Sequence, residues 1–212
     1  MRTMTKKNNI DFDNVPDIRY SHVFIVLEDD IKQRLLTCVP ILERFENGLK
    51  FIQMIGSENS EGFNSALIRT ALTELVAIED LQKTLRNKGV LINKPYRLFD
   101  AQSPLLSIAR EMRNLELHLS SSTFSSEKRD LLWGRIENIT EAMQVSRIIM
   151  WVDNLYNDRF FELNNVKDKY DFEEFSNALR WFDSQQRQWG IVELLFRAYC
   201  LYAEKLANYH SF

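Results

Sequence analysis

Residues 63–87 read FNSALIRTALTELVAIEDLQKTLRN, and the fold class predicted for the whole chain follows from this stretch. Its apolar side chains recur three or four residues apart, the spacing that places them on one face of an α-helix. Asn87, Lys88 and Gly89 then supply residue types that commonly end a helix. A helix of this length must bury its apolar face against other elements, which favours a helical bundle. The apolar positions are Leu67, Ala71, Leu75, Ile78, Leu81 and Leu85.

Helical spacing also precedes this segment. Residues 18–55 follow a helical pattern that Pro40 interrupts, because proline lacks the N–H that a helix interior needs. Within that range, residues 22–27 (HVFIVL) are compatible with either a helix or a strand. Residues 56–62 (GSENSEG) predict a turn.

Three more helices are predicted after residue 87. Asp171 and Glu174 have the spacing of a capping box, so the last of these helices is expected to begin there. With short loops between them, the segments predict an all-α, antiparallel bundle of about five to six helices. The additional helices span residues 104–119, 126–161 and 171–210.

Composition agrees with a single helical domain. Of the 212 residues, 45% are hydrophobic, enough to build a sizeable core, and only 6 are Gly and 4 Pro, too few for many short strands. Residues 1–16 are polar and end at Val15–Pro16, which predicts a flexible N-terminal arm. Residues 17–212 are then expected to form one helical-bundle domain.

Charge and cysteine content restrict the classes of function. The net charge of −3 argues against bulk polybasic binding of nucleic acid, although residues 86–135 carry a net charge of +4. Cys38 and Cys200 are far apart and lack CxxC spacing, so a reducing compartment is expected. No apolar run approaches the length of a membrane-spanning helix. We therefore expect a cytoplasmic protein with no membrane association.

Most familiar catalytic patterns are missing from the sequence. It contains no Glu-x-x-His, and its three His residues lie on separate segments, so we expect no metal site. It also contains no GxGxxG, Walker or GxSxG motif, and we expect no cofactor. A Cys–His nucleophile using Cys38 or Cys200 stays open, although a buried, unreactive Cys is the better interpretation of both.

One stretch, residues 110–119 (REMRNLELHL), combines groups suited to catalysis. On a helix at 100° per residue, Arg110, Asn114 and His118 share one face, and Arg113 flanks them. The core is expected on the opposite side, where the apolar stripe lies. The stripe consists of Leu105, Ile108, Met112, Leu115 and Leu119.

These residue types suit phosphoryl chemistry on RNA. His118 is expected in the last helical turn, where the helix dipole favours its protonated form. A His can take the proton from a 2′-hydroxyl or protonate the leaving oxygen, and an Arg can stabilise charge developing on the phosphoryl group. Asn114 and His118 are spaced i and i+4, so their side chains can touch.

Residues 113–118 (RNLELH) resemble the Arg-x4–6-His motif of the HEPN superfamily, in which a polar residue, often Asn, follows the Arg. The resemblance implies a small helical bundle and a metal-independent endoribonuclease of toxin–antitoxin or phage-defence type. It also implies that Arg113 and His118 are catalytic, that Asn114 assists them, and that two copies of the motif meet in a homodimer. Arg110 is then a candidate for substrate binding.

Two other classes of function remain as alternatives. The chain can instead be a non-catalytic helical interaction module, such as a HEPN-like adaptor, with its aromatic C-terminal helix docking another chain. Residues 189–206 carry an apolar seam suited to a partner helix. A small-molecule-binding bundle is the third alternative, although the sequence offers no phosphate loop for it. Under the ribonuclease hypothesis the expected partners are RNA, a second copy of the chain, and a cognate antitoxin or other protein.

Overall fold

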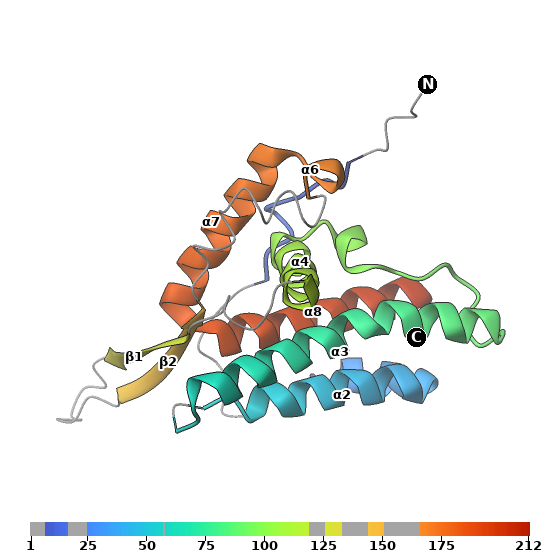
Figure 1. The fold of residues 1–212 in the computed structure, drawn as a ribbon. Coiled ribbons are helices and arrows are strands. Elements are labelled where there is room, and N and C mark those ends of the chain that lie inside the picture. Colours follow the sequence, from blue (N-terminus) through green and yellow to red (C-terminus); the bar gives the residue numbers. More distant parts are fainter. Residues whose placement is uncertain (1–6, 17–24, 57, 119–125, 133–143, 151–165) are drawn as a thin grey trace.

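The computed structural model describes residues 7–16, 25–56, 58–118, 126–132, 144–150 and 166–212. Within these ranges the protein is an all-α helical bundle, as predicted, with one two-stranded hairpin attached (Figure 1). The N-terminal half of the bundle consists of α1 (Asp29–Leu35), the 3-10 helix η1 (Leu36–Cys38), α2 (Val39–Gln53) and α3 (Glu61–Asn87). The rest comprises η2 (Leu98–Ala101), α4 (Pro104–His118), β1 (Ser126–Leu132), β2 (Gln144–Met150), α6 (Val166–Lys169), α7 (Phe172–Trp189) and α8 (Ile191–His210).

Helices α2, α3 and α8 lie side by side, with α2 antiparallel to α3, and α4 crosses this layer (Figure 1). α4 contacts α3, α7, α8 and η2, so it is central to the bundle. The expected end of α3 is confirmed, and its start lies at Glu61, two residues before the expected position. Ser60 Oγ accepts the backbone N–H of Phe63 at the start, and Gly89 adopts a φ of +74° beyond the end.

Close packing joins the layer at its centre. Gly48 on α2 lies directly against the ring of Tyr199 on α8, and the space that a larger side chain would need is already filled. The Tyr199 hydroxyl donates a 2.5 Å hydrogen bond to the carbonyl of Ala71 on α3. Gly48 therefore permits the close approach through which three helices meet.

The last predicted helix is two helices. Gly190 separates α7 from α8 with a φ of +85°, a conformation that residues with a side chain rarely adopt. The prediction of one continuous helix over 171–210 was wrong because the apolar periodicity continues across this glycine. Asp171 does cap α7, since its Oδ1 accepts the N–H groups of Glu173 and Glu174.

The predicted helix over 126–161 is also wrong where the structure describes it. β1 and β2 pair antiparallel, with Ser126 opposite Met150 and Leu132 opposite Gln144. The β-branched Val145, Ile148 and Ile149 favour a strand, and the predicted helical spacing did not weigh this preference. Residues 133–143 and 151–161 of the predicted helix lie outside the described residues.

The N-terminal segment, expected to be a flexible arm, contacts the bundle over residues 8–14. The Asn8 N–H donates to the carbonyl of Lys169 at 2.7 Å, and the Asp11 N–H donates to that of Gln102 at 2.7 Å. Ile10 is 5% exposed and belongs to the core. Of residues 22–27, 25–27 form no helix or strand and 22–24 lie outside the described part. None of the described helices is long and apolar enough to cross a membrane.

Candidate functional site

The predicted core face of α4 is confirmed where its side chains are described. Leu105, Ile108 and Met112 are each 1% exposed. The side chain of Leu115 and the whole of Leu119 lie outside the described part of the chain. Because these residues face the core, the directions of the other α4 side chains follow from their positions around the helix.

Arg110 lies on the face of α4 opposite the core stripe, as predicted, but it is not exposed there. The side chain of Arg110 is only 19% exposed, and its Nε lies 3.3 Å from Glu79 Oε1. A second nitrogen, Nη1, lies 3.4 Å from Glu111 Oε1. Burial alone would lower the pKa of Arg110, but the two carboxylates outweigh it and raise that pKa. Arg110 is enclosed because α4 is central to the bundle and has neighbours on several sides.

Glu111 is the centre of this charged network, and its side chain is fully buried. Its two carboxylate oxygens lie 3.2 and 3.0 Å from Lys169 Nζ at the end of α6. Asn114 Nδ2 also donates to Glu111 Oε2 at 3.1 Å. Sequence reasoning missed Glu111, although a signal existed. It follows Ile108 by three residues, which places it at the edge of the buried stripe.

Asn114 and Arg113, two of the predicted site residues, are brought together. Arg113 Nη1 donates to Asn114 Oδ1 at 3.4 Å, while the amide nitrogen of Asn114 is held by Glu111. Asn114 is thus fixed at both ends. Arg113 Nε is buried, and no atom of the described residues accepts a hydrogen bond from it. Within the described part of the chain, this donor of the guanidinium is left without an acceptor.

His118 is the last residue of α4. The backbone places it one turn beyond Asn114, and its side chain lies outside the described part of the structure. The predicted contact between Asn114 and His118 therefore stays a prediction. The site comprises a buried anchor at Glu111, a fixed amide at Asn114, a cation with an open donor at Arg113, and a His at the helix end.

Two hydroxyl groups lie in the same interior and were not anticipated. Tyr170 and Ser107 are fully buried, and the Ser107 side chain is the hydrogen-bond partner of the Tyr170 hydroxyl. Burial strongly raises the pKa of Tyr170, and the negative charge of Glu111 adds to this effect. The Tyr170 phenol therefore stays protonated at neutral pH. Its position after α6 gave no helical pattern from which it could have been found.

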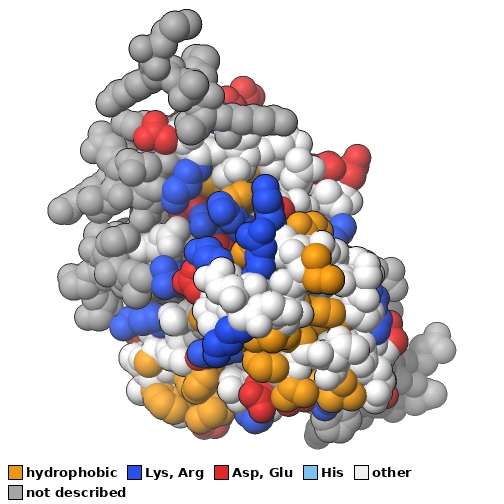
Figure 2. All heavy atoms as spheres, turned by 90° about the vertical axis from the view of Figure 1, so that its right-hand side faces the viewer, with side chains coloured by type: hydrophobic (Ala, Val, Ile, Leu, Met, Phe, Trp, Pro, Cys, Tyr) orange, Lys and Arg blue, Asp and Glu red, His pale blue; other side chains and the backbone are white. Residues whose placement is uncertain are grey.

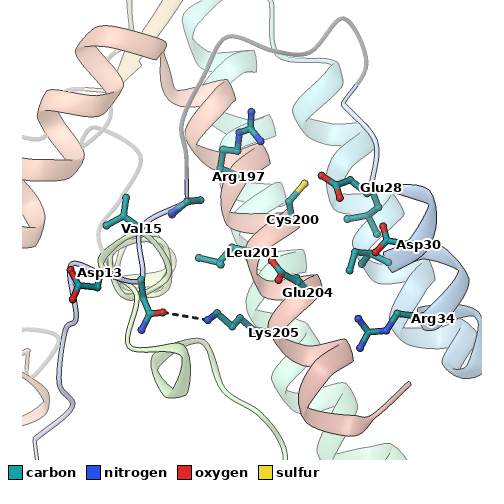
Figure 3. Close-up of a pocket in the computed structure, with 14 residues that line it drawn as sticks. Asp13, Val15, Glu28, Asp30, Arg34, Arg197, Cys200, Leu201, Glu204 and Lys205 are labelled. Atoms are coloured by element: carbon teal, nitrogen blue, oxygen red, sulfur yellow. Dashed lines mark hydrogen bonds between the residues drawn. The ribbon is translucent and has the colours of Figure 1, made fainter.

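The cleft in Figure 3 is separate from these residues and is lined by the N-terminal segment, α1 and α8. It has a volume of about 550 Å³ and contains Cys200, whose pKa is raised to about 12, mainly by burial. A thiol with that pKa is protonated at neutral pH and is a poor nucleophile. The lining cations are already engaged: Arg34 donates to Asn208 at 2.9 Å and Lys205 to Asn14 at 3.3 Å.

Cys38 is buried as well, and burial raises its pKa. The structure thus favours the inert interpretation of both thiols. The described residues include no group of His, Cys, Asp and Glu side chains arranged to hold a metal ion. Comparison with protein-family models, with curated proteins and with solved structures found no match to this chain.

Proposed function

We propose that this protein is a HEPN-like, metal-independent endoribonuclease of toxin–antitoxin or phage-defence type, with its site on α4. The observation that carries the proposal is the open donor of Arg113. A guanidinium nitrogen that has no acceptor among the described residues is costly to bury, and a phosphate oxygen is a well-suited acceptor for it. Arg113 lies five residues before His118, the proton-transfer group that RNA cleavage requires.

Each residue then has a defined role in the proposed reaction. His118 removes the proton from the ribose 2′-hydroxyl, and the 2′-oxygen forms a bond to phosphorus while the bond to the 5′-oxygen breaks. Arg113 stabilises the negative charge that develops on the phosphoryl oxygens. Asn114 is a positioning residue, because its amide is fixed by Glu111 and it accepts from Arg113. The products carry a 2′,3′-cyclic phosphate and a 5′-hydroxyl.

A second copy of the chain completes the site in this proposal. Residues five apart on one helix differ by about 140° around its axis and by roughly 7 Å along it, so they converge poorly on one phosphorus atom. In a twofold dimer, His118 of the partner subunit can protonate the leaving oxygen. We expect a homodimer, and sedimentation that shows a stable monomer at micromolar concentration would contradict it.

The test is cleavage of a labelled RNA by the purified chain in the presence of EDTA. His118→Ala and Arg113→Ala are each expected to reduce the rate by about two to four orders of magnitude. Arg180→Ala, which removes an exposed Arg on α7, is the matched control and is expected to cleave like wild type. Activity that vanishes in EDTA and returns with Mg²⁺ would overturn the mechanism.

The second candidate is a non-catalytic interaction module, and the pairing of Arg110 favours it. A residue held by Glu79 and Glu111 has an evident structural role without any substrate. The expected docking seam of this module is, however, used internally. Phe196, Tyr199 and Leu206 on α8 are at most 2% exposed within the bundle. RNA cleavage by His118→Ala and Arg113→Ala at the wild-type rate would favour the module.

A further inference from the structure

A second charged region lies where α3 and α8 end, at the end of the bundle opposite the hairpin. A cavity of about 620 Å³ opens there between the end of α3, the loop that follows it and the end of α8. Figure 2 views this side of the molecule and shows Lys and Arg side chains gathered on it. The volume is in the range of pockets that hold small ligands.

The charge of this cavity is strongly positive. Lys83, Arg86, Lys94 and Arg97 line it together with one carboxylate, Asp100. Lys83 is already paired with Asp80, at 2.7 Å, so the uncompensated charge comes from the other cations. Asp100 already accepts the backbone N–H of Arg97 at 2.8 Å. Arg86 and Lys94 are exposed, and neither forms an ion pair with another described residue. The net charge of +4 noted in residues 86–135 is thus partly concentrated in one hollow.

Aromatic rings form part of the same wall. Tyr96 and Tyr209 lie with ring centroids 5.0 Å apart, and Tyr209 is 40% exposed. Tyr96 is held from behind by the buried amide of Gln82, which accepts the Tyr96 N–H at 2.8 Å and donates to its carbonyl at 2.9 Å. The pocket therefore presents a fixed aromatic surface beside Arg86 and Lys94, which form no ion pair with another described residue.

The cavity is connected to the α4 site by stacked side chains. The guanidinium of Arg97 lies 5.4 Å from the ring centroid of Phe99, and that of Arg110 lies 4.9 Å from the same centroid. Arg97 lines the cavity, and Arg110 belongs to the charged network of α4. One phenyl ring thus joins the two regions.

We propose that this basic–aromatic pocket is a docking site for single-stranded RNA, separate from the α4 motif. Arg86 and Lys94 contact phosphates, and an unpaired base stacks on Tyr209. Unpaired bases are required because a duplex keeps its bases stacked inside, out of reach of the ring. Basic grooves with aromatic side chains bind single strands in this way. The choice of RNA rests on the proposed function, in which the strand held here is the one cleaved at α4.

The experiment measures binding without cleavage. The His118→Ala variant is titrated into a fluorescein-labelled oligouridylate, and fluorescence anisotropy is followed at several salt concentrations. The oligonucleotide has about twelve nucleotides, a length comparable to common single-strand site sizes. In this background, the double variant Arg86→Glu/Lys94→Glu is expected to bind at least tenfold more weakly. Its slope of log affinity against log salt is expected to fall by about 0.7 for each lost phosphate contact. Tyr209→Ala is expected to bind about five- to a hundredfold more weakly, with its salt slope kept.

The control is Lys50→Glu, the same charge change near the other end of the α2–α3 pair. Lys50 is exposed at the end of α2 remote from Arg86. The affinity of the Lys50→Glu variant for RNA is expected to change less than twofold. Circular dichroism establishes that each variant is folded. Should the double variant fail to fold, Lys94→Gln alone and Tyr209→Ala provide the measurement.

Two results would overturn the docking site. The first is an affinity and salt slope unchanged in the double variant and in Tyr209→Ala. The second is a polyglutamate peptide of equal length that binds as tightly and depends on the same residues, which would make the pocket a protein-binding surface. The two proposals fail separately. RNA binding at the pocket without any cleavage by wild type refutes the proposed function alone, and cleavage without pocket-dependent binding refutes the docking site alone.

Discussion

Around α4, Arg110 and Lys169 are enclosed and paired with carboxylates, whereas near the end of α3 Arg86 and Lys94 face solvent. Arg110 and Lys169 both contact the fully buried Glu111, so each of these cations has a carboxylate partner. Arg86 and Lys94 have no such partner among the described residues. The difference separates charges that hold the fold from charges available to a ligand, and Arg113, with its open donor inside the paired region, is the exception.

The largest effect is expected from a new charge on the core face of α4. Met112→Asp places an unpaired carboxylate at a position that is 1% exposed, and it is expected to abolish cooperative unfolding. Met54→Asp is the matched control, because Met54 is 52% exposed at the end of α2. Urea denaturation followed by circular dichroism tests both. A folded Met112→Asp variant would mean that the helical phase of α4 is wrong.

Removal of the central carboxylate is expected to have the next largest effect. Glu111→Ala leaves Lys169 and Arg110 without a shared partner, and it is expected to lower the free energy of unfolding by about 3 kcal/mol. Arg86→Ala removes an exposed charge and is expected to change it by less than about 0.5 kcal/mol. Equal effects of these two changes would remove the distinction between the regions.

A smaller loss is expected at the amide behind the basic pocket. Gln82 is fully buried, and its side chain bonds the backbone of Tyr96 and the hydroxyl of Tyr202. Gln82→Ala leaves these groups unpaired and is expected to lower stability by about 1–3 kcal/mol. Gln33→Ala, at an exposed position of α1, is the control. RNA affinity of Gln82→Ala in the His118→Ala background should fall as well, because Tyr96 loses its support.

The smallest effect is a dependence of stability on pH through His210. Its Nε2 lies 2.9 Å from Gln82 Oε1, and burial lowers its pKa below the ordinary value of 6.5. The unfolded chain therefore binds a proton at higher pH than the folded chain. Stability from this group is present above pH about 6.5 and is lost as the pH falls toward the folded pKa. Denaturation midpoints between pH 5 and 8 should show this fall in wild type and a flatter profile in His210→Gln.

The sequence allowed the core stripe of α4 and the end of α3 to be predicted, because apolar periodicity and end signals are local. The start of α3 was predicted two residues too late. It did not allow the environment of Arg110 to be predicted. Its partner Glu79 is 31 residues away on another helix, and only the crossing of α3 and α4 brings them together. Lys169 was missed for the same reason, since it reaches Glu111 from α6, 58 residues later.

Two errors had a different origin, in local preferences that the helical periodicity concealed. Gly190 interrupts an otherwise unbroken apolar pattern, and its φ of +85° ends α7 where periodicity predicted a continuation. In β2, the spacing of apolar residues suited a helix, while Val145, Ile148 and Ile149 suited a strand. In both cases a backbone preference outweighed the periodicity.

The single-residue junction at Gly190 also has a mechanical consequence. One residue offers only two soft torsion angles, so the angle between α7 and α8 depends on Gly190. A longer loop would let the two helices move more independently. α7 contacts the N-terminal segment, because Glu174 accepts the N–H of Ile10 at 3.4 Å. α8 carries Tyr209. The orientation of the helix that contacts the N-terminal segment, relative to the helix that carries part of the pocket wall, is therefore set in part by the backbone angles of Gly190.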